Sequence, residues 1–151
     1  MIAHQLSIFA ENKPGRLAAV TRVLAKEKIN IRATTIATSD TFGVINLIVD
    51  DPVRARAALS KAGMTVHLKE VIAVVIPDKP GGLDKLTQLL SAENVNIENA
   101  YGFVLESSEK AIFVVEVDQI ARTEEILEKH GFRTLDEDAL SSIEPFHYMK
   151  Y

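Results

Sequence analysis

The chain has 151 residues, with 17 Lys and Arg against 21 Asp and Glu and a formal net charge of −4. This length suits one average domain or two very small ones, and 47% hydrophobic with 25% charged residues is typical of a folded globular protein. The negative charge argues against nucleic acid as a partner, and the lack of cysteine excludes disulfides and thiolate chemistry. No apolar run is long enough to span a membrane and no signal peptide is evident, so we expect a cytoplasmic protein without a membrane partner.

The first half of the chain predicts six elements in the order strand, helix, strand, strand, helix, strand. Leu6, Ile8 and Ala10 alternate with Gln5, Ser7 and Phe9, which predicts a half-buried strand. After Pro14 and Gly15, apolar residues recur at helical spacing. The later elements are two strands over 30–39 and 44–49, a helix that Asp51 caps and that ends before Gly63, and a strand at 66–68.

The second half of the chain repeats the first. The segment Asn12-Lys13-Pro14-Gly15-Arg16-Leu17 returns 66 residues later as Asp78-Lys79-Pro80-Gly81-Gly82-Leu83, and Lys28-Ile29-Asn30-Ile31 returns as Asn94-Val95-Asn96-Ile97. Residues 44–50 return at an offset of 68 as residues 112–118, so two residues are added near 107–110, between two predicted strands. We therefore expect two βαββαβ repeats, over residues 1–69 and 70–138, and a tail over 139–151.

These repeats predict an α+β protein of ferredoxin-like architecture. The first and third strands of each repeat are the most apolar, as expected for the central pair of that topology. The segment 71–76 is apolar on both faces, which predicts that the sheet side away from the helices is also covered. In the tail, Leu140 and Ile143 predict one short helix, and Phe146, Tyr148 and Tyr151 are too aromatic for a purely solvated end.

The repeated loops 12–17 and 78–83 are the strongest candidates for a ligand site. Each joins a strand to a helix, whose first amides lack partners within the helix and attract a carboxylate or phosphate. Gly15 and Gly81 allow a ligand to approach the backbone, and Asn12 or Asp78 could accept hydrogen bonds from an ammonium group. Alternatively, Pro and Gly only form the turn, and Asn or Asp only caps the helix.

Asn30 and Asn96 are further candidates because each opens a predicted second strand. Their amides could close a turn locally, or they could offer a donor and an acceptor to a ligand.

These motifs resemble the ACT domain, in which Asn or Asp, a basic residue, Pro-Gly and Leu form the first turn and Ile-Asn-Ile opens the second strand. Both repeats match, so the resemblance covers everything except the tail. It implies that the two repeats pair side by side into one eight-stranded antiparallel sheet with the helices on one face. It also implies that a free amino acid binds at the interface of the repeats. The ligand-binding residues that the resemblance and the loops together indicate are Asn12, Lys13, Pro14, Gly15, Arg16, Leu17, Asn30, Ile31, Asp78, Pro80, Gly81, Gly82, Leu83, Asn96, Ile97 and Tyr101.

The two ligand sites are expected to differ, because the repeats diverge along the second strand. Ala33, Thr35 and Ile36 align with Asn99, Tyr101 and Gly102. Arg16 aligns with Gly82 in the loop. Ala10 and Ile76 stand where some ACT domains place a polar ring, so side-chain recognition at that point is not expected.

The resemblance implies a non-catalytic sensor that binds a free amino acid at the interface of the two repeats and regulates a partner enzyme or pathway of amino-acid metabolism. The alternative is a protein-interaction or regulatory subunit without a physiological ligand. A homodimer would cover the apolar sheet face. We expect no cofactor and no catalytic residue. We also expect no metal site, because the four His are far apart in sequence. An acylphosphatase-like enzyme would use an Arg in this loop, but only the first repeat has one.

Overall fold

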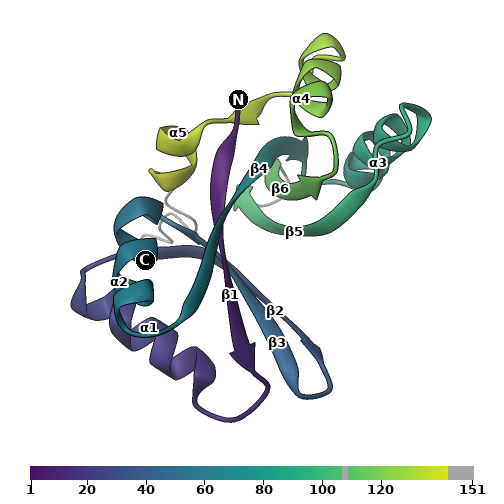
Figure 1. Ribbon diagram of the computed structural model, residues 1–151. Coiled ribbons are helices and arrows are strands. Elements are labelled where there is room, and N and C mark those ends of the chain that lie inside the picture. Colours follow the sequence, from purple (N-terminus) through teal and green to yellow (C-terminus); the bar gives the residue numbers. More distant parts are fainter. Residues whose placement is uncertain (107–108, 143–151) are drawn as a thin grey trace. The chain divides into compact units, whose positions relative to one another are not determined.

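The computed structural model describes residues 1–106 and 109–142. It contains seven strands and five helices among those residues (Figure 1). In chain order these are β1 (Ala3–Glu11), α1 (Arg16–Lys26), β2 (Ile31–Ser39), β3 (Phe42–Val49), α2 (Pro52–Lys61), β4 (Thr65–Pro77), α3 (Gly82–Ala92), β5 (Ile97–Glu106), β6 (Lys110–Val117), α4 (Ile120–Lys129), β7 (Thr134–Leu135) and α5 (Glu137–Ser141). None of the helices described is long and apolar enough to cross a membrane.

The chain divides into two compact units, His4–Lys69 and a second unit that combines Met1–Ala3 with the chain from Glu70 onward. In the first unit the strand order is β2-β3-β1-β4, and in the second it is β5-β6-β4 with β7 on the other side of β4. Each order is that of a ferredoxin-like βαββαβ unit, as predicted. The expected count of eight strands is wrong, because β4 is one strand of 13 residues that serves both units. The segment Leu68-Lys69-Glu70-Val71 has no Gly or Pro, so nothing in it interrupts the strand.

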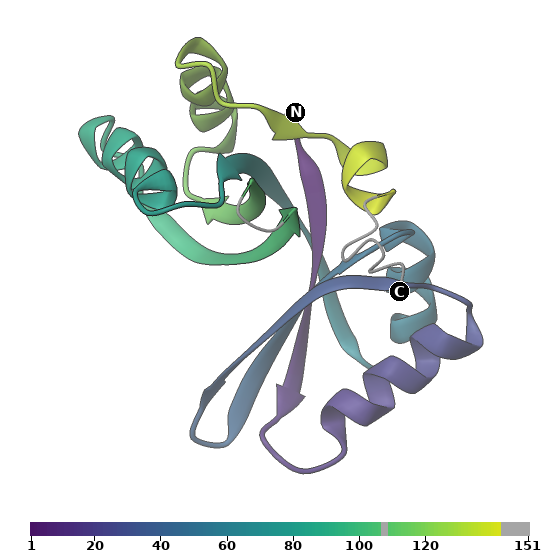
Figure 2. The ribbon, with the colours of Figure 1, turned by 180° about the vertical axis from the view of Figure 1, so that it is seen from behind.

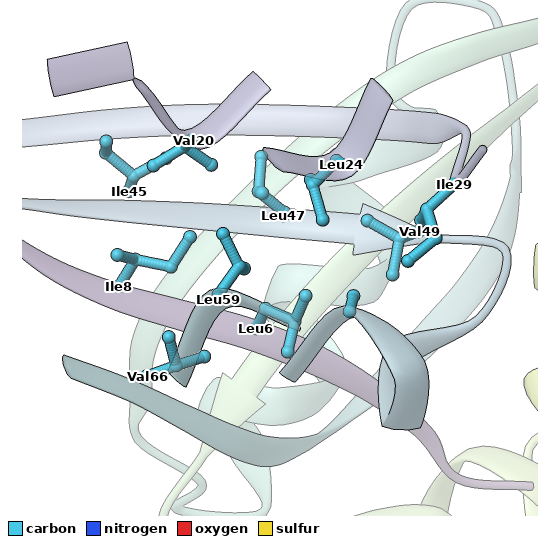
Figure 3. Packing of buried hydrophobic residues seen from close by; sticks show 11 residues of the cluster. Leu6, Ile8, Val20, Leu24, Ile29, Ile45, Leu47, Val49, Leu59 and Val66 are labelled. Atoms are coloured by element: carbon cyan, nitrogen blue, oxygen red, sulfur yellow. The ribbon is translucent and has the colours of Figure 1, made fainter. Parts of the chain in front are cut away.

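The core of the first unit lies between its strands and the helices α1 and α2. Figure 3 shows Val20 and Leu24 of α1 pointing toward Ile45 and Leu47 of β3. These side chains are at most 3% exposed, and Leu59 of α2 joins the same cluster. The apolar positions therefore fall on the faces that the helical and strand periodicities predict.

The prediction of a half-buried first strand is wrong. Gln5 and Ser7 of β1 are 0% and 1% exposed, although they lie on the face opposite Leu6 and Ile8. They satisfy their polar atoms with Asn46 of β3: the Ser7 hydroxyl donates to Asn46 Oδ1 at 2.8 Å, and Gln5 Nε2 donates to the same oxygen at 3.2 Å. A buried polar side chain is tolerated when it is hydrogen-bonded in this way, and alternation in sequence does not reveal it.

The second unit repeats the core of the first at equivalent positions. Leu86 and Leu90 of α3 replace Val20 and Leu24, and they pack with Ile72, Val74 and Val115 of the central strands. Within β4 the consecutive residues from Val71 to Val74 are all 0% exposed. Both faces of this strand are therefore buried, in line with its unbroken apolar sequence.

The helix ends follow local sequence signals. The Asp51 carboxylate accepts a hydrogen bond from the Arg54 amide at 3.1 Å and so caps α2, as predicted. After α1 and α3 the chain turns through left-handed residues, Lys28 with φ 56° and Asn94 with φ 55°. In the tail, Asp136 caps the short helix α5 and Leu140 is buried. Ile143 and the aromatic residues Phe146, Tyr148 and Tyr151 lie outside the described residues.

Candidate ligand site

The turn between β1 and α1 presents the start of a helix without a side-chain cap. Gly15 is the N-cap residue and adopts φ 88°, a left-handed conformation that glycine adopts readily. The alternative in which Asn12 only caps this helix is wrong, because no side chain caps it. Its Nδ2 donates instead to the carbonyl of Asp40 at 3.0 Å, and its amide donates to the carbonyl of Thr41 at 2.8 Å. Asn12 therefore joins the loop to the β2–β3 turn, and its Oδ1 is left as an acceptor.

The β2–β3 hairpin brings the end of β2 next to this loop (Figure 2). The hairpin turn at Asp40 and Thr41 pairs Ser39 with Phe42 and Thr38 with Gly43. Between the loop and the hairpin lies a cavity of about 200 Å³. Its walls come from the end of β1, the start of α1 and the facing ends of β2 and β3: Ala10, Glu11, Asn12, Lys13, Gly15, Arg16, Leu17, Ala18, Ile36, Thr38, Gly43 and Ile45.

The charges around this cavity are arranged about Glu11. Lys13 Nζ lies 3.0 Å from Glu11 Oε2 and Arg16 Nη2 lies 3.9 Å from Oε1. The hydrogen bond and charge of Lys13, and then the charge of Arg16, lower the pKa of the Glu11 carboxyl below its ordinary value. Arg16 Nε is buried and makes no hydrogen bond to any residue that the structure describes. A buried donor without a partner is costly, so this nitrogen favours an acceptor brought by a ligand.

The second loop has the same backbone but different side chains. Gly81 is the N-cap of α3 with φ 85°, and the Asp78 amide donates to the carbonyl of Glu109 at 3.1 Å, as the Asn12 amide does to Thr41. Gly82 is packed closely, because a Cβ atom there would lie 2.1 Å from the Pro77 carbonyl oxygen. Leu83 is 42% exposed. The second unit therefore has glycine where the first has Arg16, because the Pro77 carbonyl leaves no room for a side chain at position 82.

Asn30 and Asn96 do not line the cavity of the first loop. Each precedes its strand, and a main-chain amide and an aspartate side chain close each turn: the Asn30 main-chain amide donates to Asp50 Oδ1 at 3.0 Å and the Asn96 main-chain amide to Asp118 Oδ1 at 3.3 Å. Both Asn side chains are exposed. Ile31 and Ile97 begin the strands and pack against the cores of their units. The alternative in which the side-chain amides of Asn30 and Asn96 close the turn is therefore wrong, because the Asp50 and Asp118 side chains do this.

The second strands differ between the units, as predicted from the alignment of the repeats. Ile36 of β2 is 50% exposed and lines the cavity. Its counterpart Gly102 lies against the ring of Phe113, since a Cβ there would approach the ring carbon Cδ2 to 3.1 Å. Nearby, burial and then the charge of Glu116 raise the pKa of the Tyr101 hydroxyl above its ordinary value. Tyr101 is therefore a neutral phenol at physiological pH.

The structure brings together most of the predicted residues of the first loop. Asn12, Lys13, Gly15, Arg16 and Leu17 line one cavity, and Pro14 lies in the same turn. Sequence reasoning missed Thr38, Gly43 and Ile45 in its wall. Counting outward from the two-residue turn at Asp40 would have placed Thr38 opposite Gly43, because hairpin register follows turn length.

The fold and the sequence together define the class of protein. A family model described as an ACT domain pair matches residues 1–144, so the chain belongs to the family of ACT domain pairs. The resemblance read from the two loops is thereby confirmed.

Individual relatives agree with this assignment. The chain is similar to a protein of known crystal structure from Bacteroides thetaiotaomicron, with 39% identity over 94% of this chain and 97% of that chain and a TM-score of 0.88. The regulatory subunits of aspartate kinase from Thermus thermophilus and Thermus flavus share the fold, with TM-scores of 0.60 and 0.58. Their identities are 16% and 17%, with 87% and 84% of this chain and 97% and 92% of those chains covered. No functionally curated protein matches the sequence.

Proposed function

We propose that the protein is a non-catalytic sensor in which a free amino acid binds at the first turn of an ACT unit and thereby controls a partner enzyme of amino-acid metabolism. The observation that carries this proposal is the cavity of about 200 Å³ at loop 12–17. It is smaller than the pockets of about 300–1,000 Å³ that hold drug-sized ligands, so its size suits an amino acid.

Each end of an amino acid has a partner in this cavity. The first-turn amides that follow Gly15 suit a carboxylate, because they point out of the helix without intrahelical acceptors. Arg16 Nε supplies a further donor without a partner. Asn12 Oδ1 can accept from the ammonium group. The apolar walls from Leu17, Ile36 and Ile45 would contact the side chain of the ligand.

The second loop would form a related site with different selectivity. Asp78, Pro80, Gly81, Gly82 and Leu83 are its counterparts, and Gly82 supplies no guanidinium. Asn30 and Asn96 immediately precede the second strands, and Ile31, Ile97 and Tyr101 lie on them. We propose that these five residues contact a ligand held by the loop of another ACT unit. This division of the site makes binding depend on the association of units.

Ligand binding would act on the partner by shifting a population of states. A dissociation constant between about 1 μM and 1 mM corresponds to roughly 4 to 8 kcal/mol, which a ligand of about ten heavy atoms can supply. A homodimer is part of this proposal. The regulatory subunits of aspartate kinase that share the fold support a partner enzyme in the same kind of role.

Thermal melts with each of the twenty amino acids at millimolar concentration test the proposal. A ligand at a hundred times its dissociation constant stabilises the folded state by about 2.7 kcal/mol, which raises Tm by about 5–11 °C for a chain of this size. In Arg16→Ala the shift at the first site should fall, because the unpaired donor is lost while the Asn12 bond to Asp40 remains. The control Lys26→Ala, in the last turn of α1, should retain the full shift.

The outcomes separate the two functional readings. A selective shift that depends on Arg16 or on Asp78 supports the sensor. If no amino acid raises Tm, the sensor is refuted, and the alternative of an interaction subunit without a physiological ligand becomes the better account.

A further inference from the structure

A larger cavity of about 630 Å³ lies in the second unit, around the end of β4. No residue of loop 78–83 lines it, so it is separate from the candidate amino-acid site. Its floor is apolar and includes Ile76, Leu89 and Phe132. This volume is within the range of about 300–1,000 Å³ that is typical of pockets for small molecules larger than an amino acid.

Three cations from separate segments of the chain surround this floor. Lys110 begins β6 and pairs with Pro77 on one side of β4. The carbonyl of Arg133 accepts from the Val75 amide at 2.9 Å on the other side of β4, and Lys85 comes from α3. All three line the cavity, and Glu109 is the only carboxylate among its described lining residues. The chain as a whole carries a net charge of −4, so this positive cluster runs against the overall charge.

None of these cations takes part in an ion pair with another described residue. The ion pairs among the described residues involve other cations, such as Arg54 and Arg122. His130 also lines the cavity. Its Nδ1 donates to the carbonyl of Ile126 at 2.9 Å, which leaves Nε2 available as an additional polar contact.

The equivalent groove of the first unit provides an internal comparison. It holds about 300 Å³ at the end of β1, and its only charged residues, Glu11 and Arg16, lie 3.9 Å apart as an ion pair. By alignment of the repeats, Ala19, Phe42 and Thr65 occupy the places of Lys85, Lys110 and Arg133. The same fold is therefore built without these cations, which shows that packing does not require them.

We propose that this cavity binds a small anionic molecule with an apolar body, with the three cations holding a carboxylate or phosphate group and the apolar floor holding the body. Charge complementarity supports this occupant, since unpaired Lys and Arg attract carboxylate and phosphate groups. The site lies entirely within one unit and does not depend on the amino-acid site.

Isothermal titration calorimetry with three naphthalene probes tests the proposal. The probes are 1-naphthoate, 1-naphthyl phosphate and the neutral 1-naphthol, which share one apolar body. We expect at least one anion to bind at least tenfold more tightly than 1-naphthol and to weaken as salt is raised, because salt screens exposed charges. Preference for the carboxylate or for the phosphate would identify the class of head group.

A triple variant and a matched control locate the binding. In Lys85→Ala with Lys110→Gln and Arg133→Thr, affinity for the anion should fall at least tenfold. The control removes three cations elsewhere, Lys26→Ala, Lys61→Ala and Lys129→Ala, each from the last turn of a helix, and should bind as the parent does. Circular dichroism verifies that both variants fold. The proposal is overturned if neither anion binds, if 1-naphthol binds equally well, or if the control loses as much affinity as the triple variant.

Discussion

Gly82 offers a direct test of the close packing at the start of α3. An alanine Cβ at this position would lie 2.1 Å from the carbonyl oxygen and 3.2 Å from the carbonyl carbon of Pro77. Both neighbours are backbone atoms, so a side-chain rotation cannot relieve the contact. Inserting a methyl group into such a site typically costs about 1–3 kcal/mol. Helix propensity alone acts in the opposite direction, since alanine is favoured over glycine by about 1 kcal/mol within a helix.

The sign of the change in stability in Gly82→Ala therefore shows whether the steric contact with Pro77 or the helix propensity of alanine dominates. If steric conflict prevails, Gly82→Ala should lower the free energy of unfolding by about 1–3 kcal/mol, which corresponds to a Tm lower by about 2–12 °C for a chain of this size. Urea unfolding followed by circular dichroism measures the free energy of unfolding, and a thermal melt measures Tm. The control is Arg16→Ala at the equivalent position, where the exposed pair with Glu11 contributes less than about 1 kcal/mol. A Gly82→Ala protein as stable as the parent, or more stable, would refute the argument.

Three further predictions concern the backbone, the core and one tyrosine. Lys28 has φ 56°, so Lys28→Gly should raise the free energy of unfolding by about 0.5–1 kcal/mol in urea titrations, and a loss of stability would contradict the strain. Leu24→Ala and Leu90→Ala, at equivalent buried positions, should each cost about 2–5 kcal/mol, and a cost below about 1 kcal/mol at either would contradict its burial. The pKa of Tyr101 is raised in the folded protein, so above the unfolded-chain pKa of about 10 this tyrosine ionises more readily in the unfolded chain. The free energy of unfolding is therefore unaffected by this group below that pH and falls as the pH rises above it. A pH titration of tyrosinate absorbance in the parent and in Tyr101→Phe should differ only above the ordinary range of tyrosine ionisation, and a difference near pH 10 would contradict the raised pKa.

The order of the elements could be predicted because the apolar periodicities and the turn residues act locally. Gly15, Gly63, Gly81 and Gly131 all have positive φ, and each stands at a helix end that the sequence indicated. The continuity of strand β4 was harder to predict from the sequence. Its two halves belong to different repeats, and only the absence of a turn residue near Lys69 distinguishes one long strand from two short ones.

The candidate site could be predicted in part. The loop residues follow from the repeated motif, which is contiguous in sequence. Thr38 and Gly43 enter the cavity through hairpin register, which depends on pairing between strands. The alternative in which Asn12 only caps the helix failed for the same reason, because its partner Asp40 lies on the hairpin turn and not in the helix that follows.

The duplication within this chain separates what the fold requires from what it leaves open. Positions that set the backbone or the core are alike in the two units: Gly15 and Gly81 both cap a helix in the left-handed conformation, and Leu24 and Leu90 are both buried. The positions that line the groove at the end of the first strand of each repeat differ, with Ala19 and Thr65 in one unit against Lys85 and Arg133 in the other. Since both units fold, the framework does not depend on these differences, and we expect them to act on what each unit binds. We therefore expect that substituting residues of one unit by those of the other alters the proposed ligand recognition while leaving the shared framework intact.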